Sequence, residues 1–276
     1  MAAVNPMSHP WIEPATGARL GHAATLRRMA EARVALLGER HDVAADHRWQ
    51  GNVIAGLAAL RDELVVGFEM FPRRAQPALD AWTEGRSDEA AFLRDSGWQQ
   101  VWGFDPALYR PIFDLCRELR LPARALNVDR PIVSLVGRDG WGALPEAERA
   151  WMTPARPAGA AYRRYLFEVT GGARPDRKAA SAEDPAFDRF VRAQQTWDRA
   201  FACAIATALA DRPGALVVGL IGRGHLEYGH GTPDQLADLG VAPVIVALPG
   251  GGRGDDAAIA DLLFEPASGA HADTAR

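Results

Sequence analysis

Short runs of consecutive apolar residues, separated by longer segments with helical periodicity, dominate the sequence. The runs that have the length and composition of buried strands lie at 33–38, 64–69, 215–222 and 241–248, with a weaker one at 122–128. Continuous apolar runs are typical of parallel strands that helices cover on both faces. Apolar residues at three- and four-residue spacing predict helices that begin near residue 49 and extend over 107–121 and 185–210. This alternation predicts an α/β fold with a mostly parallel central sheet flanked by helices.

One long stretch interrupts the alternation. Residues 139–184 hold no strand-like run, are rich in tryptophan and tyrosine, and end in the polar segment 171–184. We interpret 139–184 as a helical insertion, able to act as a lid, within a single α/β domain that spans 1–276. The glycine-rich residues 250–256 predict a flexible loop, and 266–276 predict a disordered tail.

Composition and charge narrow the class of protein. The chain has 276 residues, of which 48% are hydrophobic and 24% charged, so it can bury a sizeable core. Its net charge of −4 argues against nucleic acid or an anionic membrane as the main partner. Cys116 and Cys203 are expected to be buried as small apolar residues, and no apolar run is long enough to span a bilayer. As the sequence stands we expect a cytoplasmic protein, or a periplasmic or membrane-anchored one if a leader has been removed.

Polar residues collect where the predicted strands end. Glu39 and His41 follow the strand at 33–38, and His225 follows the strand at 215–222, each histidine three residues after a glycine. Because ligands of parallel sheets bind outside the carboxyl ends of the strands, we expect both histidines to point into one crevice. Glu69 adds a carboxylate that is costly to bury without a partner.

These four residues allow three interpretations. Glu39, His41, Glu69 and His225 can perform general acid and base catalysis, or His41, Glu69 and His225 can bind a divalent metal ion. Alternatively, the cluster is an ion network that satisfies itself and only closes the end of the sheet.

Residues of other predicted elements are candidates to support this site. Gln194 lies in the middle of the apolar stripe of the helix at 185–210, and Asp198 lies one turn further on, so both need hydrogen-bond partners. Arg130, which follows the strand at 122–128, can hold the carboxylate of Glu69 or of a ligand, or form a structural salt bridge. Glycine motifs of nucleotide-binding loops and the serine-hydrolase elbow are both missing from the sequence.

At these residues the sequence resembles the ChaN-like haem-binding uptake proteins of the Tiki superfamily, which also includes the erythromycin esterases and the Tiki and TraB proteins. The matching motifs follow in order over about residues 33–235: LGERHD at 37–42, GFEMF at 67–71, SGW at 96–98, YRPI at 109–112, ALN at 125–127, Gln194 with Asp198, and GRGH at 222–225. The resemblance implies a mixed α/β fold and a role in bacterial haem or iron acquisition or handling. It also implies that haem binds between the two subunits of a homodimer, with a tyrosine as iron ligand.

For the haem-binding function, the resemblance places the cofactor-binding residues in or near the insertion. Tyr162 and Tyr165 are the nearest candidates for the iron ligand, and Arg130, Arg163 or Arg164 would pair with the propionates. Gln194 and Asp198 would support the site. Many members of the family carry a lipid-attachment cysteine, whereas no cysteine precedes Cys116 in this chain.

Two other functions stay open beside haem binding. One is an ester or peptide hydrolase, metal-dependent or metal-free, in which His41 is the general base, Glu39 orients it, and His225 ligates a metal or stabilises an oxyanion. The other is an enzyme that uses haem as a cofactor.

Overall fold

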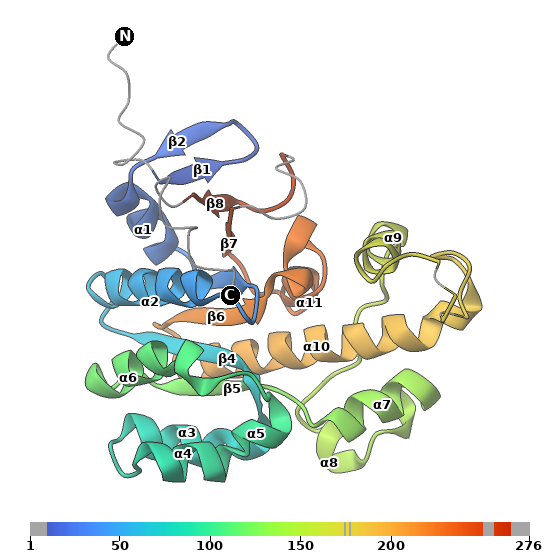
Figure 1. Cartoon of the computed structure of the whole chain (residues 1–276), viewed down its shortest axis with the longest axis horizontal. Helices are drawn as coiled ribbons and strands as arrows, with labels where there is room; N and C mark the ends of the chain where they lie inside the picture. The colour runs from blue at the N-terminus through green and yellow to red at the C-terminus, as the bar shows by residue number, and fades with distance from the viewer. Residues whose placement is uncertain (1–9, 174, 177, 251–256, 266–276) are drawn as a thin grey trace.

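A computed structural model of the chain describes residues 10–173, 175–176, 178–250 and 257–265 (Figure 1). Within these residues, eight strands form one sheet in the order β2-β1-β8-β7-β3-β6-β4-β5. The strands are β1 (Trp11–Glu13), β2 (Ala18–Leu20), β3 (Val34–Glu39), β4 (Leu64–Pro72), β5 (Ala123–Asn127), β6 (Leu216–Gly222), β7 (Val244–Pro249) and β8 (Leu262–Phe264).

The five predicted strands are β3 to β7, and their pairings are parallel, as is that of β7 with β8. β1 is antiparallel to both β2 and β8, so the sheet is mixed at one edge. The prediction of an α/β fold with a mostly parallel sheet is therefore confirmed. The antiparallel edge was not predicted, because its three-residue strands are too short to show a pattern.

Helices cover both faces of the sheet. They are α1 (His22–Ala30), α2 (Ala44–Ala58), α3 (Gln76–Thr83), α4 (Glu89–Ser96), α5 (Trp98–Val101), α6 (Arg110–Glu118), α7 (Arg130–Asp139), α8 (Glu146–Arg149), α9 (Ala160–Val169), α10 (Asp188–Asp211) and α11 (Thr232–Asp238). Apolar residues of α1, α2, α3, α4 and α6 pack on one face, and those of α10 and α11 pack on the other. No helix in the described part of the chain has the length and apolarity needed to cross a membrane.

The predicted insertion at 139–184 contains α8 and α9 and, among its described residues, no strand. α9 packs through Tyr162 and Leu166 against Phe187 and Val191. Figure 1 shows α7 and α9 on opposite sides of the N-terminal half of α10, beyond the strands. Residues 251–256 and 266–276, predicted to form a loop and a tail, lie outside the described residues.

Candidate functional site

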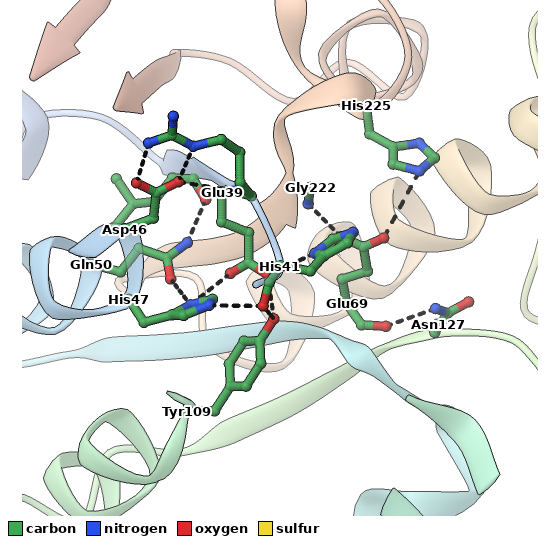
Figure 2. Close-up of polar contacts among 12 residues, drawn as sticks. Glu39, His41, Asp46, His47, Gln50, Glu69, Tyr109, Asn127, Gly222 and His225 are labelled. Carbon is green, nitrogen blue, oxygen red and sulfur yellow. Dashed lines mark hydrogen bonds and ion pairs between the residues drawn. The ribbon is translucent and has the colours of Figure 1, made fainter. Parts of the chain in front are cut away.

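The carboxyl ends of β3, β4 and β6 meet at one edge of the sheet and bring the predicted polar residues together. Glu39, at the end of β3, is in register with Gly222, at the end of β6. The backbone N–H of Gly222 donates to the Glu69 carboxylate from β4 (Figure 2). A Cβ on Gly222 would lie 2.7 Å from His41 Cε1 and 3.4 Å from Glu69 Oε2. Only glycine leaves room for the imidazole to approach the carboxylate at this position.

Glu39 holds His41 in place. Its Oε1 accepts hydrogen bonds from His41 Nδ1 at 2.9 Å and from the Tyr109 hydroxyl at 2.6 Å, while His47 Nδ1 lies 3.5 Å from Oε2. The Glu39 side chain is fully buried. Burial raises its pKa, but the imidazoles of His41 and His47 outweigh burial and hold the pKa at about 2. Glu39 therefore stays ionised and fixes the orientation of the His41 ring.

A second carboxylate–histidine pair lies on the other side of Glu69. Asp198 of α10 is fully buried and accepts hydrogen bonds from His225 Nδ1 at 2.7 Å and from the Tyr162 hydroxyl at 2.6 Å. Burial lowers the pKa of His225, but the charges of Asp198 and Glu69 outweigh burial and raise it to about 9. His225 is therefore an imidazolium at neutral pH.

Glu69 lies between the two pairs. Its Oε1 is 3.8 Å from His225 Nε2, and its backbone carbonyl accepts a 2.7 Å hydrogen bond from the Asn127 side chain. Burial lowers the pKa of His41, but the hydrogen bond to Glu39 and the charge of Glu69 outweigh burial. The pKa of His41 is therefore raised above that of a free imidazole. The four residues predicted from the ends of the strands, Glu39, His41, Glu69 and His225, thus form one connected cluster, which we call the sheet-edge site.

A hollow of about 280 Å³ opens on the sheet-edge site. Glu69 and His225 line it directly, together with Trp102, Asn127, Arg130, Gln194 and Trp197. Glu39, His41 and Asp198 are not among the residues that line it. The Trp102 ring packs edge-on against His41, with ring centroids 4.7 Å apart. Glu69 and His225 therefore face the hollow, whereas Glu39 and Asp198 hold the two histidine rings in position.

Of the three roles predicted for Arg130, the structure shows neither the pair with Glu69 nor a structural salt bridge among the residues it describes, and pairing with the carboxylate of a ligand stays a prediction. Among the described residues Arg130 has no ion pair; it is exposed at the first position of α7 and lines the hollow. Glu69 is already bonded to the Gly222 N–H and faces His225, so it does not need Arg130. Gln194 lies half-buried at the hollow, and its neighbour Gln195 is the buried amide, bonded to the Arg156 carbonyl at 2.5 Å.

Within the part of the chain that the structure describes, no group of three or more histidine, cysteine, aspartate or glutamate side chains is arranged to hold a metal ion. His41 and His225 each use Nδ1 to bind a carboxylate, and the raised pKa of His225 opposes the neutral state that ligation needs. Metal binding by His41, Glu69 and His225 stays a prediction.

The two tyrosines of the insertion lie in different surroundings. Tyr162 is buried, and its hydroxyl is bonded to Asp198. Tyr165 is half-buried, and its hydroxyl donates to Glu227 Oε2 at 2.8 Å. Burial, followed by the charge of the neighbouring carboxylate, raises the pKa of both phenols. Tyr165, unlike Tyr162, lines a hollow of about 320 Å³ beside α9, which we call the α9 hollow.

His230 also lines the α9 hollow, and it was not among the site residues predicted from the sequence. Its ring lies 5.4 Å from that of Tyr162 and 6.1 Å from that of Tyr165, between centroids. Burial lowers the pKa of His230, so its imidazole is neutral at pH 7 and able to ligate iron. Its signal in the sequence is its position between Gly229 and Gly231, five residues after His225.

Together these features define an α/β protein whose mostly parallel sheet carries a polar site at its carboxyl edge. The sequence profile of the family described as "Haem-binding uptake, Tiki superfamily, ChaN" matches residues 25–236. The chain therefore belongs to this family. No curated protein sequence matches it.

Two solved structures share the fold. The structure titled "Cofacial heme binding to ChaN of Campylobacter jejuni" aligns with a TM-score of 0.71 and 18% identity, over 92% of this chain and 95% of that one. The structure of the type III effector HopBA1 aligns with a TM-score of 0.50 and 11% identity, over 95% of this chain and 98% of that one. At these identities the likeness concerns the fold alone.

Proposed function

We propose that this protein binds haem and acts in bacterial haem or iron acquisition or handling. The observation that carries the proposal is the family match, which covers residues 25–236 and so includes both hollows. The likeness of fold to a ChaN whose structure is titled for cofacial haem binding supports it.

The α9 hollow has the residues that a haem needs. Tyr165 and His230 supply an oxygen and a nitrogen ligand for iron, and the exposed Arg164 supplies a cation for a propionate. Haem, if bound, would supply an iron that these atoms could ligate. Of the two tyrosines predicted as ligand, Tyr165 is favoured, because Tyr162 is buried and its hydroxyl holds Asp198.

Tyr165 needs to lose its proton to ligate iron, and Glu227 is placed to receive it. Glu227 already accepts the Tyr165 hydroxyl hydrogen bond, and Arg223 pairs with the same carboxylate. Burial and the charge of Glu227 raise the pKa of Tyr165, so the phenolate would form only with the positive charge of a bound ferric iron beside it. His230 is already neutral and needs no such step.

A hemin titration tests the proposal. We expect a saturable Soret band whose position shifts in Tyr165→Phe, because the phenolate ligand is lost, and an unshifted band in the matched control Tyr109→Phe. Tyr109 likewise donates its hydroxyl to a buried glutamate, but at the sheet-edge site. Haem binding between two subunits further predicts that hemin converts monomer to dimer in size-exclusion chromatography. If hemin gives no saturable Soret change, the proposal is wrong.

Hydrolysis is a second candidate function, favoured by the two carboxylate–histidine pairs on either side of Glu69. His41, oriented by Glu39, would take a proton from water, and the His225 imidazolium would stabilise the oxyanion that forms. His41 acts only when deprotonated, so the rate rises with pH through its raised pKa. His225 acts only when protonated, so the rate falls above about pH 9.

The hydrolytic function is tested with a panel of nitrophenyl esters and peptide anilides. The expected result is a bell-shaped pH dependence of kcat/KM that His41→Ala abolishes and Tyr165→Phe leaves unchanged. Activity that survives His41→Ala would exclude His41 as the base.

A further inference from the structure

A third hollow, of about 530 Å³, lies between α7 and α10 and shares Arg130 and Trp197 with the hollow of the sheet-edge site. We call it the α7–α10 groove. Its lining residues on each helix recur at three- and four-residue spacing, so each helix presents one continuous stripe to it. Because the two hollows share these residues, the groove adjoins the hollow that Glu69 and His225 line.

Small residues line the groove where the two helices cross, and aromatic residues line its α10 side. A Cβ on Gly137 would lie 3.1 Å from the Arg189 carbonyl and 3.4 Å from Ala193 Cβ, so the two helices cross closely there. Phe190 and Trp197, both half-buried, stand on the same stripe of α10. Arg189 and Trp197 are eight positions apart (197 − 189), or about 12 Å along the helix. The groove therefore suits an extended or flat apolar body.

The charges in the groove are positive and unpaired. Arg130 and Arg189 are exposed, and neither has an ion pair among the residues that the structure describes. The neighbouring arginines are occupied: Arg138 pairs with Asp139 at 2.7 Å, and Arg192 donates to the Gly137 carbonyl at 2.8 Å. The hydrogen bond from Arg138 lowers the pKa of Asp139, and the charge of Arg189 adds to this without forming an ion pair. Two guanidinium groups without ion pairs, close to aromatic side chains, suit a ligand that has an anionic group and an apolar part.

We propose that the α7–α10 groove binds a small amphipathic carboxylate, which is a ligand separate from haem. The apolar body packs on Phe190 and Ala193 and reaches Trp197. The carboxylate pairs with Arg189 at the end away from the sheet, because Glu69 repels an anion at the other end. The far end of the body then enters the hollow in front of Glu69 and His225.

The test uses 11-(dansylamino)undecanoic acid as the probe and its methyl ester as the uncharged match. The acid is expected to bind saturably, with rising dansyl emission, and the ester to bind about fivefold more weakly or worse. Arg189→Gln is expected to weaken the acid by a similar factor and to leave the ester unchanged. Arg212→Gln, an exposed arginine at the C-terminal end of α10 that forms no ion pair among the described residues, is the control and is expected to leave both affinities as they are.

Equal affinity for the acid and the ester, or an Arg189→Gln variant that binds the acid as the unaltered protein does, would overturn the inference. Hemin distinguishes this ligand from haem, since Arg189→Gln is expected to retain its Soret titration. Loss of hemin binding in Arg189→Gln would place haem in the groove, and would overturn the separation of the two ligands. If the unaltered protein does not bind hemin, only the haem-binding proposal is wrong, because the dansyl probe tests binding in the groove separately.

Discussion

The sheet-edge site and the α9 hollow contain similar residue types that are held in different ways. His41 and His225 each donate Nδ1 to a buried carboxylate, and both carboxylates also accept a tyrosine hydroxyl. In the α9 hollow, His230 makes no hydrogen bond through its ring to any described residue, and burial keeps it neutral. The comparison teaches that the site at the sheet edge is built to retain protons in a fixed geometry. In the α9 hollow, by contrast, His230 offers a neutral nitrogen.

Removal of Asp198 is expected to have the largest effect. Asp198→Ala leaves a buried imidazolium and a buried tyrosine hydroxyl without their acceptor, so we expect the free energy of unfolding to fall by about 3–5 kcal/mol. Urea unfolding measures this loss. The control Asp234→Ala removes an exposed carboxylate paired with Arg156 and is expected to cost less than about 1 kcal/mol. Similar losses in both variants would show that Asp198 is not the anchor of the site.

Acid is expected to weaken the sheet-edge site through Glu39. The pKa of Glu39 is about 2 in the folded protein and about 4.5 in the unfolded chain, so its contribution to stability is complete above pH 4.5 and is lost as the pH falls toward 2. This contribution is on the order of 3 kcal/mol. Urea unfolding between pH 5 and pH 3 should therefore show a smaller decline in Glu39→Gln than in the unaltered protein. Parallel declines would contradict the folded-state pKa.

The close approach at Gly222 is expected to have an intermediate effect. In Gly222→Ala, the new Cβ would contact His41 and Glu69, so one of the two side chains has to move, at a cost of about 1–3 kcal/mol. The ring signals of His41 in an NMR titration report the movement. Gly142→Ala, where a Cβ meets nothing within 4 Å, is the control. An unchanged His41 titration in Gly222→Ala would show that the contact is relieved elsewhere.

The smallest expected effect concerns the α9 hollow. His230→Gln removes a neutral nitrogen ligand but leaves Tyr165, so we expect hemin affinity to fall about tenfold, with no loss of stability beyond about 0.5 kcal/mol. Soret titration and thermal unfolding measure the two quantities. His47→Gln, at the sheet edge, is expected to reverse this pattern, because it removes a buried partner of Glu39. Unchanged hemin affinity in His230→Gln would exclude His230 as a haem ligand.

The central part of the fold and half of the site follow from the sequence. The apolar runs predict β3 to β7, and the rule that strand ends share an edge brings Glu39, His41, Glu69 and His225 together. The pattern does not show which groups lie behind this set. Tyr109 and His47 have the spacing of ordinary packing residues, and only the folded chain reveals that they face Glu39.

Side-chain contacts that depend on the distance between two elements in the fold were predicted wrongly or not at all. Arg130 and Glu69 have complementary charges and both lie near strand ends, but the backbone N–H of Gly222 occupies the carboxylate instead. A backbone donor carries no signature in the sequence, so this competition was not predictable. The contact of Tyr162 with Asp198 was missed for a related reason, since α9 reaches α10 through an insertion whose path the sequence pattern does not specify.

Asp198 connects the sheet-edge site to α9, because one of its oxygens anchors His225 and the other accepts the hydroxyl of Tyr162. Any displacement of α9 that withdraws this hydroxyl concentrates the negative charge of Asp198 on the imidazolium, and so tightens its hold on the proton. By thermodynamic reciprocity, deprotonating His225 must bias the position of α9 to the same extent. The buried carboxylate of Asp198 thus couples the protonation of His225 to the position of α9.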